Sequence, residues 1–77
     1  MSREEVQERI QKVMETEIGA SVSERENLKE SGIDSLTLVS VIAAIEEEFN
    51  ICFSDDDLMP VNLETVFALA ELTEKYL

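Results

Sequence analysis

The sequence predicts an all-α protein, a bundle of three main helices and one short helix with a long loop between the first two helices. The chain has only two glycines and one proline in 77 residues, and helix-forming residues such as Glu, Leu and Ala dominate it. Apolar residues also recur at helical spacing in three separate segments. At this length we expect one domain over residues 1–77, with a single small hydrophobic core.

The first predicted helix covers residues 3–17. Ser2 and Glu5 have the spacing of a capping box at its start. Gly19 can end the helix by adopting the left-handed conformation. Charged side chains alternate with apolar ones in this segment, which is the pattern of an amphipathic helix. The apolar positions are Val6, Ile10, Val13 and Met14.

Residues 19–33 lack a sustained periodicity and are predicted to form a long loop. A connection of this length is uncommon in a compact domain and is often functional. Leu28 and Ile33 are the apolar residues that we expect to hold the loop against the core.

The second predicted helix begins at Asp34 and Ser35, and Asn50 breaks its pattern. It ends with three consecutive glutamates, residues 46–48, although acidic side chains near a helix C-terminus oppose the helix dipole. Recognition by a partner protein would explain why these glutamates are present despite the unfavourable interaction. The alternative is that the last turn is simply solvated, and that the packing of the apolar stripe outweighs the unfavourable interaction. The apolar stripe consists of Leu38, Val41, Ile42, Ile45 and Phe49.

Residues 55–59 are predicted to form the short helix. Ser54 would open it, and Pro60 would end it because the residue before a proline avoids helical geometry. Asn62 is predicted to cap the last helix. The inward positions of that helix are Leu63, Val66, Leu69, Ala70, Thr73 and Tyr76.

The composition is strongly acidic, with eighteen acidic and six basic residues and a formal net charge of −12. We therefore expect no binding to nucleic acids or anionic membranes, because their phosphate groups require cations. The sequence shows neither a signal peptide nor an apolar segment for membrane insertion. Such a charge favours partner proteins with basic patches, although it is also typical of a surface that is acidic for solubility alone.

Several kinds of active site are absent from the sequence. The chain has no histidine, which removes the usual base of Ser-His and Cys-His nucleophile pairs. Its single cysteine, Cys52, precludes an internal disulfide and has no neighbouring cation, so we expect an unreactive thiol and a cytoplasmic location. Residues 55–57 lack the glycine and distal glutamate of a calcium-binding loop, and no glycine-rich phosphate-binding loop is present. We therefore expect neither an enzyme nor a dedicated metal site.

One short motif, Gly32-Ile33-Asp34-Ser35-Leu36, lies where the long loop meets the second helix. Taken alone, an Asp-Ser pair at a helix start is typical of simple capping. Together with Glu46-Glu47-Glu48-Phe49 and the order of helices and loop, it resembles the acyl carrier protein family over nearly the whole chain. The resemblance implies a helical carrier that holds acyl groups as thioesters on a phosphopantetheine arm.

The resemblance also implies roles for individual residues. Ser35 would be the serine that a phosphopantetheinyl transferase modifies with coenzyme A, and Asp34 the acidic residue that assists recognition and metal-dependent transfer. Leu36 would be the apolar residue beside the arm that partners contact. The docking surface for the basic patches of acyl-loading, elongating and acyl-transferring enzymes would include Glu46, Glu47 and Glu48.

The second helix departs from the family at two positions. Carriers of fatty acid synthesis usually have acidic residues at the positions of Thr37 and Ser40. The neutral residues here leave two pathways open, fatty acid synthesis and a specialised polyketide, nonribosomal peptide or modified-lipid system. In the family, a fatty chain can also fold back between the helices. The small residues that could leave space for it are Ala43, Ala44, Ala68 and Ala70.

A second function also fits the sequence, namely a degenerate carrier fold that serves as an acidic adaptor or complex subunit through protein–protein contacts. The intact Asp34-Ser35-Leu36 motif favours the carrier. We expect a monomer, because like-charged surfaces repel and the pattern leaves no apolar stripe over once the bundle has formed.

Overall fold

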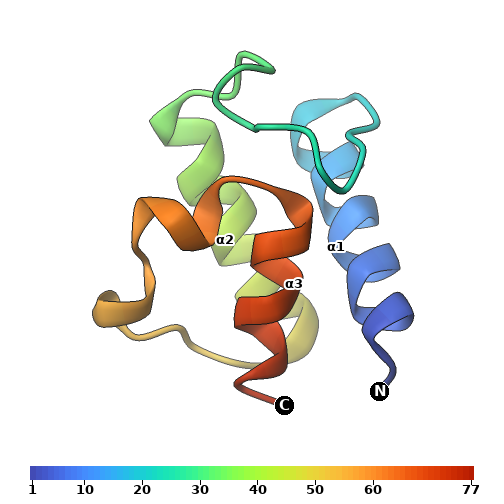
Figure 1. The fold of residues 1–77 in the computed structure, drawn as a ribbon, viewed down its shortest axis with the longest axis vertical. Helices are drawn as coiled ribbons and strands as arrows, with labels where there is room; N and C mark the ends of the chain where they lie inside the picture. The colour runs from blue at the N-terminus through green and yellow to red at the C-terminus, as the bar shows by residue number, and fades with distance from the viewer.

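The computed structural model describes all residues 1–77 and contains three α-helices and two short 3₁₀ helices. These are α1 (Arg3–Ile18), α2 (Ser35–Phe49), η1 (Asp55–Asp57), η2 (Pro60–Leu63) and α3 (Val66–Glu74). α1 runs from the N-terminus towards the long loop, and α2 and α3 both run back, so the two chain ends lie at the same end of the molecule (Figure 1). The structure has no strands, and the predicted all-α bundle is confirmed. None of the helices is both long and apolar enough to cross a membrane.

The ends of α1 form as the sequence predicts. The hydroxyl of Ser2 accepts a hydrogen bond of 3.2 Å from the backbone N–H of Glu5. Gly19 has a φ of 72°, in the left-handed region, and its N–H donates to the carbonyl of Glu15. A side chain at that φ would strain the backbone, so glycine ends the helix at little cost.

The prediction that one short helix covers residues 55–59 is wrong in its bounds. The structure has a single 3₁₀ turn over Asp55–Asp57, and the Ser54 hydroxyl does not cap it. Pro60 begins a second 3₁₀ turn, η2, where its missing N–H would have had no helical partner. Two separate turns therefore replace one short helix.

The predicted cap of the last helix is also wrong. Asn62 lies within η2, and its side-chain amide donates to the carbonyl of Asp57 at 2.8 Å. Thr65 caps α3 instead, because its hydroxyl accepts a hydrogen bond of 3.0 Å from the N–H of Ala68. Both Asn and Thr are good capping residues, and the tertiary structure selects the later one.

The core lies between the three helices and also takes in residues from the long loop. Val22 and Leu28 of that loop are buried, at 6% and 2% exposure. The only buried polar residue, Thr73, donates its hydroxyl proton to the carbonyl of Leu69 at 2.8 Å. The buried apolar residues are Val6, Ile10, Met14, Val22, Leu28, Val41, Ile42, Ile45, Phe49, Phe53, Val66, Leu69, Ala70 and Leu72.

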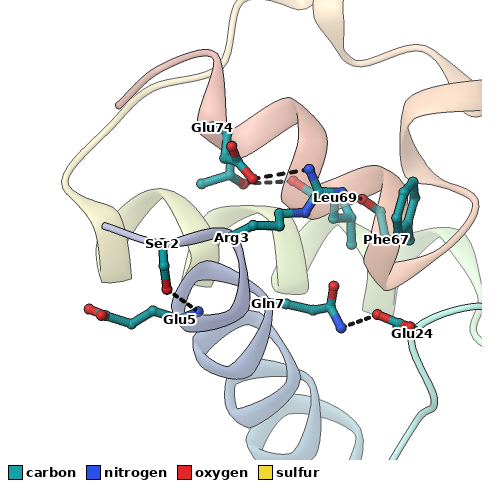
Figure 2. Close-up of polar contacts among 9 residues, drawn as sticks. Ser2, Arg3, Glu5, Gln7, Glu24, Phe67, Leu69 and Glu74 are labelled. Carbon is teal, nitrogen blue, oxygen red and sulfur yellow. Dashed lines mark hydrogen bonds and ion pairs between the residues drawn. The ribbon is translucent and has the colours of Figure 1, made fainter.

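Two arginines lie against the ring of Phe67 and connect α1 and the long loop to α3. Arg3 reaches from α1 to the carboxylate of Glu74 at 3.0 Å and to the carbonyl of Phe67 at 3.1 Å (Figure 2). Its guanidinium lies 4.6 Å from the centre of the Phe67 ring, and that of Arg25 lies 4.8 Å from it. Each such cation–π contact is worth about 0.5–1 kcal/mol at an exposed site.

A third arginine connects α1 to α2. The guanidinium of Arg9 pairs with the carboxylate of Glu48 at 2.7 Å and lies 5.0 Å from the centre of the Phe49 ring. All three arginines of the chain therefore act within the fold, where they join α1 and the loop to the other helices.

Candidate functional site

Ser35 is the exposed first residue of α2. Asp34 precedes it in extended geometry, and its Oδ1 accepts a hydrogen bond of 2.8 Å from the N–H of Thr37. The backbone N–H groups of Ser35 and Leu36 donate to no other backbone group. Free N–H groups and the positive end of the helix dipole both favour an anion at this position.

The carboxyl group of Asp34 is held in its ionised form. The hydrogen bond from the backbone of Thr37, followed by the side chain of the same residue, keeps the pKa of Asp34 below its usual range. A hydrogen bond to the charged form of an acid stabilises that form. A fixed negative charge therefore lies beside Ser35 at neutral pH.

The loop before Ser35 is tied to the rest of the molecule. The N–H of Leu28 donates to the carbonyl of Glu64 at 2.8 Å, and the N–H of Ile33 donates to the carbonyl of Leu28 at 3.2 Å. Gly32 has a φ of 86°, which an L-residue rarely adopts, so glycine fits this turn best. These bonds, with the burial of Leu28, fix the point at which the chain enters α2. The prediction that Leu28 and Ile33 hold the loop is confirmed.

A cleft of about 270 Å³ opens beside Ser35 between the loop, α2 and η2. Half of the ten residues that line this cleft are hydrophobic. The alanines at positions 43, 44, 68 and 70, which the sequence suggested as the source of such space, do not line it. The lining residues are Asn27, Leu28, Lys29, Ile33, Ser35, Leu38, Leu58, Pro60, Leu63 and Glu64.

The outward side of α2 next to Ser35 is apolar. Leu36 is 81% exposed and Val39 is 66% exposed, and Ala43 is exposed as well. Ser40 lies between them on the helix surface, and the nearest acidic residues are Asp34, just before Leu36, and Glu46 and Glu47, one turn after Ala43. The expectation that no apolar stripe would remain outside the bundle is therefore wrong, because Leu36 and Val39 repeat at helical spacing on the solvent side.

The three glutamates predicted for docking lie at the other end of α2, about 16–20 Å along the helix axis from Ser35. They differ in their contacts. The carboxylate of Glu46 accepts a hydrogen bond of 2.8 Å from the N–H of Phe53, and Glu48 pairs with Arg9. Glu47 is exposed, and its carboxylate forms neither an ion pair nor a hydrogen bond. The structure thus places Asp34, Ser35 and Leu36 together and separates them from the glutamates.

No catalytic machinery accompanies Ser35. The chain has no histidine to act as a base. No group of three or more His, Cys, Asp or Glu side chains is arranged to hold a metal ion. The thiol of Cys52 is free and exposed. Ser35 therefore lies beside no histidine and no cluster of metal-ligating side chains.

Comparison with known families and proteins identifies the chain. Residues 4–73 match the family model described as a phosphopantetheine attachment site. The chain is 35% identical over 74 residues to an acyl carrier protein of Nitratidesulfovibrio vulgaris, covering 91% of this chain and 96% of that protein. It is 35% identical over 77 residues to an acyl carrier protein of Saccharopolyspora erythraea, covering 95% and 79%. Over 51 residues it is 43% identical to an acyl carrier protein homolog of Mycoplasma pneumoniae, covering 66% of this chain and 60% of that protein. No solved structure matches.

The chain belongs to the acyl carrier protein family. Members of this family bear a covalently attached phosphopantetheine group and carry cargo for enzymes, without catalysing a reaction themselves. The start of α2 fits such a group, because an exposed hydroxyl there adjoins free backbone N–H groups that favour a phosphodiester.

Sequence reasoning identified the motif at the start of α2 but missed the opposite wall of the cleft. Leu58, Pro60 and Leu63 reach the site from the 3₁₀ segment. The only local signal in the sequence was that Leu58 and Leu63 lie on either side of Pro60. This signal does not indicate that the two leucines face the cleft beside Ser35.

Proposed function

We propose that Ser35 is the residue that receives phosphopantetheine, and that the protein carries acyl groups as thioesters on the thiol of this arm. The observation that supports this is the exposed position of Ser35 at the first turn of α2, within the residues that match the attachment-site family. A helix start that favours an anion suits the phosphodiester that attachment would create. We also propose that residues 1–77 form a single carrier domain.

Attachment requires a phosphopantetheinyl transferase. The Oγ atom of Ser35 would form a bond to the β-phosphorus of coenzyme A, and the bond to the leaving phosphate oxygen would break and release 3′,5′-ADP. Because this chain offers no base, the transferase must take the proton from the hydroxyl group. The ionised Asp34 adjoins the reacting serine and is proposed to assist recognition and the Mg²⁺-dependent transfer.

The partners in this proposal are the enzymes that load, elongate and transfer acyl groups in fatty acid, polyketide or related biosynthesis. A net charge of −12 would steer partners with basic patches towards the carrier. The arm raises the effective concentration of its cargo at each enzyme that the carrier visits. Asp34 and Leu36 would be contacted beside the arm, and residues 46–48 at the far end of α2.

The proposal also includes a monomeric state and a cytoplasmic location. The free thiol of Cys52 fits a reducing compartment. Repulsion between strongly acidic surfaces disfavours self-association. A molar mass in light scattering that stays at one chain over a range of concentrations would support the monomer.

An intact-mass measurement tests the attachment site. The unmodified protein is incubated with coenzyme A, Mg²⁺ and a broad-specificity phosphopantetheinyl transferase. We expect the mass to increase by one phosphopantetheine, and we expect no increase for Ser35→Ala. Ser40→Ala is the matched control, because Ser40 is also an exposed serine on α2 and its variant should still be modified. Modification of Ser35→Ala, or none of the parent protein, would refute the proposal.

An experiment in cells separates the carrier from the alternative function, an acidic adaptor that acts through protein–protein contacts. If the protein is a carrier, a strain in which Ser35→Ala replaces the parent protein should lose the carrier function completely, because no arm can be attached. Full activity of that strain would favour the adaptor.

A further inference from the structure

The cleft beside Ser35 is lined by one basic side chain, that of Lys29. The other two lysines of the chain lie elsewhere. Lys12 lines a separate groove between α1 and α2. Lys75 follows the last residue of α3, at the end of the molecule that holds both chain termini and lies opposite the start of α2 (Figure 1). Lys29 is therefore the lysine that the fold places beside the proposed attachment site.

The backbone that carries Lys29 is held in place on both sides. The N–H of Gly32 donates to the carbonyl of Lys29 at 3.2 Å. The preceding residue, Leu28, is buried, and its N–H donates to the carbonyl of Glu64 at 2.8 Å. The side chain of Lys29 thus starts from a fixed point at the cleft, and its flexible stem allows the ammonium group to turn towards a charge there.

The ammonium group of Lys29 has no acidic partner within the protein. All three ion pairs of the chain involve arginines. Glu64 lines the same cleft without pairing with Lys29, and Glu30, the next residue in the chain, does not line it. In a chain with eighteen acidic residues, an unpaired cation beside Ser35 remains free to bind a further anion.

Modification of Ser35 would create such an anion at an unfavourable place. The new phosphodiester would carry its charge next to the ionised carboxylate of Asp34, and like charges so close together repel each other. Asp34 is held there by its hydrogen bond of 2.8 Å from the N–H of Thr37. The free N–H groups at the start of α2 offset part of this repulsion, and a cation on the wall of the cleft would offset more of it.

We infer that the ammonium group of Lys29 binds the phosphodiester on Ser35 and thereby fixes the direction in which the arm leaves the carrier. This inference rests on the proposed function, because Ser35 must bear the arm. The contact is a charge-assisted hydrogen bond from the ammonium group to a phosphate oxygen, and no covalent bond changes. Lys29 is a positioning residue, since it holds the attached end of the arm and takes no part in the chemistry of the cargo.

The test compares each protein before and after modification with phosphopantetheine, with complete modification verified by intact mass. The variants are Lys29→Gln, Lys29→Arg and Lys75→Gln. Lys75→Gln is the matched control, because it removes the same charge from an exposed lysine far from Ser35. At about 0.05 M NaCl, we expect Lys29→Gln to lower the melting temperature of the modified form, relative to its own unmodified form, by about 1–8 °C compared with the parent. This difference should disappear at about 0.5 M NaCl, and Lys29→Arg and Lys75→Gln should behave as the parent does.

Phosphorus NMR of the modified proteins gives a readout that a merely structural role of Lys29 would not move. We expect the phosphodiester resonance to shift in Lys29→Gln and to coincide with that of the parent in Lys75→Gln. In the modified parent, we also expect a nuclear Overhauser effect between the side-chain methylene next to the ammonium group of Lys29 and the first methylene of the arm.

The inference is overturned if Lys29→Gln and Lys75→Gln give the same melting-temperature difference and the same phosphorus resonance. Absence of the Overhauser effect in the modified parent would overturn it as well, and this check does not depend on any variant. In both cases the parent would still gain the mass of one phosphopantetheine, whereas failure of the proposed function would leave the parent and every variant unmodified.

Discussion

Replacing Leu28 by alanine tests whether the long loop is packed against the helices as the structure describes. Leu28 is 2% exposed, and its backbone N–H donates to the carbonyl of Glu64. The substitution removes three buried carbon groups, which at about 0.8 kcal/mol each corresponds to about 2.4 kcal/mol of lost burial. A residual cavity adds to this, so we expect the free energy of unfolding to fall by about 3 kcal/mol.

Urea denaturation followed by circular dichroism measures this change. A chain of 77 residues is expected to have about 4–12 kcal/mol of total stability, so the variant should lose a large part of it. The corresponding decrease in melting temperature is about 12–24 °C. Leu36→Ala is the matched control, because the same atoms are removed from a side chain that is 81% exposed, and its effect should stay within about 0.5 kcal/mol. Equal effects of the two substitutions would refute the packing of the loop.

Two further predictions concern charge. With a net charge of −12, the folded state repels itself, so we expect the melting temperature to rise by several degrees between 0.05 and 0.5 M NaCl; a constant value would contradict this. The pKa of Asp34 is lowered in the folded state, so the unfolded state binds more protons in acid and the contribution of this carboxylate is lost as the pH falls below about 4. In urea denaturation, the stability difference between the parent and Asp34→Asn should therefore be largest at neutral pH and shrink as the pH falls below about 4, whereas a difference independent of pH would argue against the hydrogen-bonded carboxylate.

The parts of the fold that were predicted correctly are those with local signals. Ser2, Gly19 and Asp34 each cap a helix through a residue type and spacing that only neighbouring residues determine. The apolar stripe of α2 is likewise visible in the sequence, since four of its five residues are buried. Caps and stripes were therefore sufficient to place α1 and α2.

The start of α3 could not be predicted in this way, because distant contacts determine it. The N–H of Phe67 donates to the carbonyl of Glu24, and the N–H of Leu28 donates to that of Glu64. Both bonds join the long loop to the segment where the chain enters α3. Residue type alone favours Asn62 as the cap, because Asn is a better capping residue than Thr, and these loop contacts lie beside Thr65, the cap that is used.

The motif at Ser35 was found from the sequence, but its surroundings were not. The cleft exists because the loop, α2 and η2 meet there, and small residues elsewhere in the helices carry no information about it. The exposure of Val39 also depends on which side of α2 the other elements cover.

The basic residues of this chain fall into two groups with different consequences for chemical labelling. Arg3, Arg9 and Arg25 each lie over a phenylalanine ring and hold elements of the fold together. The lysines are exposed and form no ion pairs; they are Lys12, Lys29 and Lys75. Amine-directed reagents will therefore reach every lysine side chain and leave the arginine contacts between the helices in place. A fluorophore attached to Lys29, on the wall of the cleft beside Ser35, becomes a local reporter of what the cleft contains.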